Sequence, residues 1–126
     1  MRIAKDKLRY DLYDRRFAVY MAYHDLLVAI SEKDDAEAEL RKANAARAHS
    51  PFLLNAPLGT YLEELHKEAF RINATVKIVR DRSLPTDLAA ANQLAHDRLA
   101  FVNRISELIK KFEPFLRLSD FSQPSS

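Results

Sequence analysis

Apolar residues recur every three or four positions along most of this chain, which is the spacing of amphipathic α-helices. Prolines, a single glycine and capping residues divide this pattern into four stretches. The stretches predict helices at residues 2–30, 34–48, 57–79 and 87–113. We therefore expect an all-α fold, an antiparallel helical bundle of three long helices and one shorter helix.

Local signals mark the boundaries of these helices. Asp34 offers an N-cap, followed three residues later by an acid at the spacing of a capping box. Pro57 suits the first turn of the third helix, and Pro114 ends the fourth. Because the connections are short, we expect one helical bundle domain at residues 1–121 and a flexible C-terminal tail at 122–126.

The third helix has the most regular apolar pattern. Seven apolar residues alternate in steps of four and three, as the a and d positions of a heptad do: Leu58, Leu62, Leu65, Ala69, Ile72, Val76 and Val79. This coiled-coil spacing predicts a buried seam against another long helix.

The apolar arc of the fourth helix is broader and covers about half of the helix circumference at ~100° per residue. It contains Leu88, Ala91, Leu94, Ala95, Leu99, Phe101, Val102, Ile105, Leu108, Ile109 and Phe112. Such a width indicates burial against two neighbouring helices, or against one neighbour and another subunit. After this helix, residues 115–118 are expected to fold back onto the bundle.

The first helix gathers its aromatic residues on one side. That arc contains Leu8, Leu12, Tyr13, Phe17, Val19, Tyr20, Tyr23, Leu26, Leu27 and Ile30. On the opposite side, Lys7, Asp11 and Arg15 have the i,i+4 spacing of an exposed, charge-paired surface. We interpret most of the aromatic content as core and not as a stacking surface.

Three arginines interrupt these apolar arcs: Arg9 and Arg16 on the first helix, and Arg98 on the fourth. A guanidinium group stays charged, so within an apolar arc it needs a carboxylate, carbonyl groups, an aromatic face or an external anion. Glu68 and Asp97 are the candidate ion-pair partners. Alternatively, the three arginines converge on an anionic ligand or on the acidic group of a protein partner.

Other chemistry has little support in the sequence. The chain has no cysteine, which excludes disulfides and thiolate metal sites, and a net charge of +2 does not indicate nucleic-acid binding. Glu63 and His66 have the spacing of half a di-iron site, but the remaining ligands are not found. The sequence therefore predicts no catalytic residue, no metal and no cofactor.

The N-terminal segment KLRYDLYDRRFAVY resembles the opening of a widespread bacterial family of small helical proteins. The family motif is approximately K-L-R-x-D-L-F-[DE]-[KR]-R-[FY]-x-[VI]-Y. Weaker similarities follow at Phe52-Leu53, at Tyr61-Leu62-Glu63-Glu64-Leu65 and at Phe112-Glu113-Pro114-Phe115-Leu116. Many members carry a transmembrane helix just before the motif. The resemblance supports the helical fold and implies no activity.

From these observations we expect a non-catalytic helical bundle that acts through protein–protein contacts, as a homo-oligomer or with a helical protein partner. The alternative is a module that binds an anion or nucleic acid through the three arginines. We expect a cytoplasmic protein, and membrane contact at the inner face only if an anchoring segment precedes Met1 in the natural protein.

Overall fold

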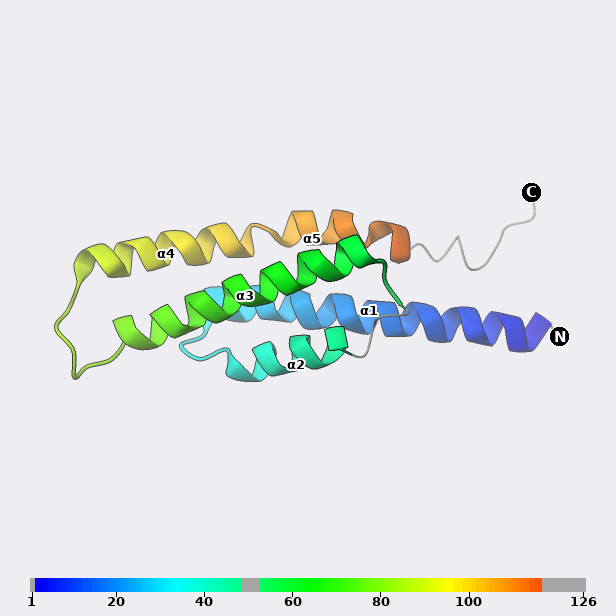
Figure 1. Cartoon of the computed structure of the whole chain (residues 1–126), viewed down its shortest axis with the longest axis horizontal. Helices are drawn as coiled ribbons and strands as arrows, with labels where there is room; N and C mark the ends of the chain where they lie inside the picture. The colour runs from blue at the N-terminus through cyan, green and yellow to red at the C-terminus, as the bar shows by residue number, and fades with distance from the viewer. Residues whose placement is uncertain (1, 49–52, 117–126) are drawn as a thin grey trace.

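The computed structural model of this chain describes residues 2–48 and 53–116, with side chains from residue 11 onward in the first helix. The described residues form helices and no strands. Figure 1 shows α1 and α3 in the middle of the bundle, with α2 on one side and α4–α5 on the other. The predicted all-α bundle is confirmed.

The first two helices, α1 (Arg2–Glu32) and α2 (Glu37–Ala48), form an antiparallel pair. The helix α1 ends at Glu32, two residues later than predicted. The prediction of Asp34 as the N-cap of α2 is wrong, because the carboxylate of Asp35 accepts the hydrogen bond from the backbone N–H of Glu37 at 2.9 Å. Asp34 instead pairs with Arg80 across 3.3 Å.

A buried asparagine completes the start of α2. The side-chain oxygen of Asn73, which comes from α3, accepts a hydrogen bond from the backbone N–H of Ala36 at 2.9 Å. Asn73 is the buried polar residue of the described core, and this bond satisfies a donor that the helix itself leaves unpaired. This long-range cap could not be predicted from local sequence, because its donor and acceptor are 37 positions apart.

The third helix, α3 (Ala56–Val79), starts at an asparagine N-cap, Asn55, whose side chain accepts from the N–H of Leu58 at 3.0 Å. Pro57 occupies its first turn, as predicted. The predicted a/d seam is buried from Leu58 to Val76, and Val79 packs against the core from a half-buried position.

The predicted fourth helix is two helices, α4 (Leu88–Val102) and α5 (Ile105–Phe112), followed by the short 3₁₀ helix η1 (Glu113–Phe115). Asp87 is not inside α4 but caps it, accepting from the N–H of Ala90 at 3.0 Å. The break falls at Asn103 and Arg104, where the N–H of Arg104 donates to the carbonyl of Phe101, three residues back. This tighter turn redirects α5 so that its apolar residues reach the core.

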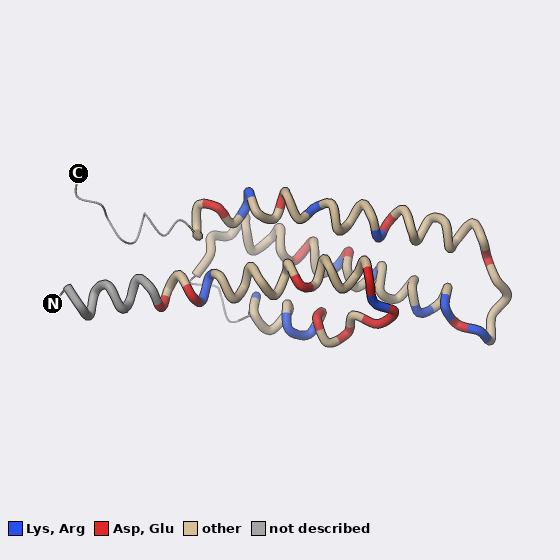
Figure 2. Tube along the Cα trace, turned by 180° about the vertical axis from the view of Figure 1, so that it is seen from behind, with Lys and Arg blue, Asp and Glu red and all other residues tan. Residues whose placement is uncertain are grey.

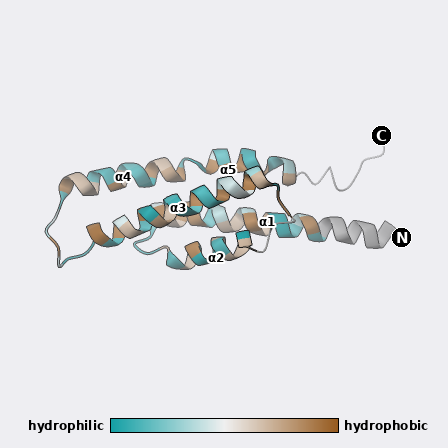
Figure 3. Ribbon diagram, viewed as in Figure 1, coloured by the Kyte–Doolittle hydropathy of each residue, from teal (hydrophilic) through white to brown (hydrophobic). Residues whose placement is uncertain are grey.

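The core is formed by all five helices, and its largest fully buried side chains include Tyr23 of α1, Phe101 of α4 and Phe112 of α5. Phe115 and Leu116 pack against it, so the first half of the predicted fold-back is observed, while 117–118 lie outside the described residues. The joined ends of α3 and α4 extend beyond the α1–α2 turn (Figure 1), and the hydrophobic colouring of Figure 3 continues onto this projecting end.

Candidate functional site

Arg16 binds backbone and aromatic groups of its own bundle. Its Nε donates a hydrogen bond to the carbonyl oxygen of Leu53 at 2.8 Å. Its guanidinium carbon lies 5.4 Å from the ring centroid of Phe115, a cation–π distance. Partial burial lowers the pKa of Arg16 from its ordinary value. This arginine therefore joins α1 to the segment before α3 and to η1.

Arg98 caps the C-terminal end of α1. Its Nε donates to the carbonyl oxygen of Ile30 at 2.7 Å, and its Nη2 donates to that of Lys33 at 2.8 Å. The last carbonyl groups of a helix lack partners within the helix and carry the negative end of its dipole. The positive charge that the sequence placed inside an apolar arc is thus balanced by backbone oxygens.

The structure does not bring the predicted arginines together. Arg16 and the Ile30 carbonyl that receives Arg98 are fourteen residues apart on α1, which corresponds to ~21 Å at 1.5 Å per residue. The side chain of Arg9 lies outside the described residues. The observed contacts of Arg16 and Arg98 therefore provide no common anion site.

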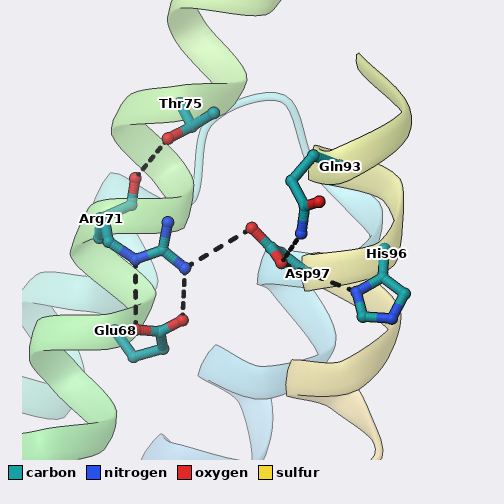
Figure 4. Close-up of polar contacts among 6 residues, drawn as sticks. All are labelled: Glu68, Arg71, Thr75, Gln93, His96 and Asp97. Atoms are coloured by element: carbon teal, nitrogen blue, oxygen red, sulfur yellow. Dashed lines mark hydrogen bonds and ion pairs between the residues drawn. The ribbon is translucent and has the colours of Figure 1, made fainter. Parts of the chain in front are cut away.

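The two predicted acidic partners meet on a different arginine (Figure 4). Arg71 of α3 forms hydrogen bonds with both carboxylate oxygens of Glu68 and an ion pair with Asp97 of α4 at 3.6 Å. Asp97 also accepts from the side-chain amide of Gln93 at 2.9 Å. The contact with Glu68 raises the pKa of Arg71. This cluster ties α3 to α4, and it accounts for the negative charge of Asp97 inside the protein's own fold.

Further along the same side of α4–α5, other charged groups also turn toward α3. The guanidinium of Arg104 and the ammonium of Lys111 lie 5.6 and 5.3 Å from the ring centroid of Tyr61. Arg104 also pairs with Glu107 at 3.0 Å. The charged residues between Asp87 and Glu107 are therefore engaged with neighbouring groups of the bundle.

The solvent-facing side of α4, in contrast, lacks charged residues. Here the exposed residues carry no aspartate, glutamate, lysine or arginine side chain, because Asp97 and Arg98 contact Arg71 and the carbonyl oxygen of Ile30. Most of the α4 tube in Figure 2 is accordingly tan. We call this surface the α4 outer face. It consists of Leu88, Ala89, Asn92, Gln93, Ala95, His96, Leu99, Ala100 and Asn103.

Two large apolar residues dominate the α4 outer face, and a third continues it onto α5. Leu88 is 73% exposed, Leu99 62% and Ile109 48%. The sequence assigned all three to one apolar arc, and the structure shows that the bundle covers only part of that arc. Leu94, Phe101, Leu108 and Phe112 are buried.

Aromatic residues of α1 pack against α5. Tyr20 packs edge-on against Phe112 of α5, with ring centroids 5.5 Å apart, and Phe17 lies next to Tyr20 at 5.9 Å. Phe17 is 41% exposed, so the prediction that it belongs to the core is wrong, whereas Tyr23 is fully buried as predicted. Phe17 is therefore an exposed aromatic residue on the side of α1 that carries Tyr20.

Glu63 and His66, which have the spacing of half a di-iron site, contact other groups of the bundle. Glu63 lies near Lys67 at 3.4 Å, and His66 Nε2 lies 3.2 Å from the carbonyl oxygen of Leu40. Within residues 2–48 and 53–116, no group of three or more His, Cys, Asp or Glu side chains could hold a metal ion.

Comparison with protein-family models, with curated proteins and with solved structures finds no match for this chain. The resemblance of the N-terminal motif to a bacterial family stays a prediction. In the part of the chain that the structure describes, no helix is long and apolar enough to cross a membrane.

Proposed function

We propose that this protein is a non-catalytic helical bundle that acts through protein–protein contacts and self-associates through the α4 outer face. The observation that carries the proposal is an exposed helix surface without charge in a chain of which 30% of the residues are charged. Depletion of charged residues distinguishes the centre of protein interfaces from ordinary surface. Large exposed apolar side chains at coiled-coil spacing fit the same role.

A second copy of this chain suits the face because a neutral surface can meet itself without repulsion. The stretch from Leu88 to Ile109 is ~32 Å long at 1.5 Å per residue and ~10 Å wide. These dimensions give ~320 Å² per copy, roughly half of the ~600 Å² per partner at the lower limit of stable interfaces. We therefore expect weak association, with dissociation constants on the order of 10–100 micromolar.

Within this proposal the protein works in the cytoplasm, because a chain without cysteine suits a reducing compartment. The arginine-based alternative gains no support from Arg16 and Arg98, since both donate to backbone carbonyl groups.

The test compares two substitutions at equally exposed positions. Leu99 is 62% exposed on the α4 outer face, and Phe70 is 63% exposed on α3. Light scattering at rising protein concentration should give a mass above the 14.5 kDa of one chain for the unmodified protein and for Phe70→Glu. Leu99→Glu should remain at the mass of one chain, because it would place a carboxylate in an apolar contact.

Both variants should melt at the temperature of the dilute parent protein, since neither side chain is buried. A parent protein that stays at one chain mass up to millimolar concentration would contradict the proposal. So would equal association of the two variants.

A further inference from the structure

His96 is the residue of the α4 outer face whose charge depends on pH near neutrality. The other residues of the face are leucines, alanines and side-chain amides, which do not titrate. A histidine side chain gains or loses its proton between about pH 5 and 8. The His96 side chain is 77% exposed, so the solvent controls its protonation. The α4 outer face therefore has a neutral form and a positively charged form.

His96 lies in the middle of the α4 outer face. It follows Leu88 by eight residues and precedes Asn103 by seven. It is next to Ala95 and lies three residues before Leu99, so the two share one side of the helix. A contact that covers most of this face also covers its middle, whichever way the second copy runs. His96 of both copies is then enclosed in any orientation.

A carboxylate lies beside His96, but it is already engaged with other groups. The Oδ1 atom of Asp97 is 3.8 Å from His96 Nδ1, which is longer than a hydrogen bond (Figure 4). This oxygen accepts a hydrogen bond from Gln93 at 2.9 Å, and the Oδ2 atom pairs with Arg71 of α3 at 3.6 Å. A proton on His96 would have to share this carboxylate with an arginine.

The charges behind His96 balance one another. From α3, Glu68 and Arg71 form a hydrogen-bonded pair. On α4 itself, Asp97 and Arg98 carry opposite charges. Two acids and two arginines sum to zero, so a proton on His96 adds a positive charge that this cluster does not compensate.

The neighbouring part of α1 contributes backbone oxygens. Arg98 donates to the carbonyl oxygens of Ile30 and Lys33, which do not titrate. The ammonium group of Lys33 pairs with Glu39 of α2 at 3.0 Å. The contacts of Arg98 with α1 therefore add no carboxylate that could neutralise a protonated His96.

We infer that His96 makes self-association through the α4 outer face dependent on pH, with association when the imidazole is neutral and separation when it is protonated. This regulation rests on the self-association proposed above. An imidazolium in the contact would lose water without gaining a free carboxylate, and it would meet the like charge of the other copy. The single chain thus binds the proton more tightly than the associated form, so association is present above neutral pH and is lost as pH falls.

A matched pair of histidine variants tests the role of His96. His96→Gln replaces the imidazole with a neutral side chain at an exposed position. His24→Gln is the control, because His24 also precedes an aspartate, at 3.4 Å, but lines the hollow between α1 and α2. Sedimentation equilibrium of the parent and both variants at about pH 7.5 and about pH 5.5 gives the dissociation constants. Circular dichroism at both pH values checks that the helices are retained.

The dissociation constants of the parent and of His24→Gln should rise at least about fivefold at the lower pH, while that of His96→Gln should change less than about twofold. A parent constant that does not change with pH, or an equal rise for His96→Gln, would overturn the role of His96 and leave self-association intact. A one-chain mass for the parent at both pH values would overturn both proposals.

Discussion

Leu99 and Phe70 are nearly equally exposed, but their surroundings differ. Around Leu99, the residues three, four and seven positions away on either side include no Asp, Glu, Lys or Arg: they are Asn92, Ala95, His96, Val102, Asn103 and Ser106. Phe70 has Lys67 three positions before it, and Glu63 and Lys77 seven positions away. An isolated apolar residue among charges is ordinary protein surface, whereas one within an uncharged strip is typical of an interface.

The difference arises from where each helix directs its charges. On α3, Glu63, Glu64, Lys67 and Lys77 point to solvent. On α4, Asp97 is bound by Arg71, and Arg98 is used to cap α1. The exposed fractions of Leu99 and Phe70 therefore do not distinguish the two surfaces. The positions of the charged residues on α4 and α3 do.

The largest difference in unfolding free energy is expected between a substitution in the buried a/d seam of α3 and one on the α4 outer face. Leu65→Ala should lower the free energy of unfolding by about 2–5 kcal/mol, because Leu65 is fully buried and its removal leaves a cavity. Leu99→Ala should change that free energy by less than about 0.5 kcal/mol in dilute protein. Urea unfolding at sub-micromolar concentration measures both. A large loss for Leu99→Ala would show that this side chain stabilises the single chain.

The contacts that charged residues of α4 make within the bundle can be tested by removing Arg98. Arg98→Ala should cost about 1.5–3 kcal/mol in the free energy of unfolding, because two carbonyl groups at the end of α1 lose a charged donor. Arg71→Ala is the control, since its ion pairs are exposed and should contribute about 1 kcal/mol or less. Thermal or urea unfolding of the two variants gives the comparison. Equal losses in the free energy of unfolding would show that the hydrogen bonds of Arg98 contribute no more than an exposed ion pair.

A smaller change adds a charge to each surface. Ala95→Lys on the α4 outer face should weaken self-association at least about tenfold, because the ammonium group would lose water in the contact. Ala74→Lys on α3 should leave association unchanged, as both alanines are exposed but only Ala95 lies in the uncharged strip. Sedimentation equilibrium reports the two constants. Equal weakening of self-association by Ala95→Lys and Ala74→Lys would contradict the proposal.

The smallest effect concerns salt. Raising ionic strength from about 0.05 to 0.5 M should alter self-association by no more than about twofold, since the centre of the face is neutral and only its ends are charged. Binding of nucleic acid or another polyanion through arginines would instead weaken strongly over that range. A steep loss of association with salt would favour an electrostatic contact over the apolar one.

The helices themselves could be predicted from the sequence because their signals are local. The a/d seam of α3 and the helix ends near Pro85 and Pro114 need only neighbouring residues, and both are observed. The turn at Asn103 and Arg104 could not be predicted, since the apolar pattern runs through it without interruption. There the packing of α5 on the core outweighs the continuity of the helix.

The candidate site could be predicted only in part. The width of the last apolar arc indicated two neighbours, and α4 packs against both α1 and α3. Three members of that arc, Leu88, Ala95 and Leu99, are exposed and lie on the α4 outer face. The partners of Arg16 and Arg98 could not be predicted, because backbone carbonyl groups accept hydrogen bonds wherever the fold brings them and leave no mark in the sequence. The ion pair of Asp97 with Arg71 likewise depended on the packing of α4 on α3, whereas Glu68 and Arg71 are a local i,i+3 pair.

The most direct test of the central claim measures whether the α4 outer face becomes covered as concentration rises. Ala95→Cys and Ala74→Cys each introduce one thiol at an exposed alanine of a chain without cysteine. The rate of labelling by a maleimide should fall severalfold for Ala95→Cys between 1 µM and about 500 µM protein and stay constant for Ala74→Cys. Concentration-independent labelling at both positions would contradict the account.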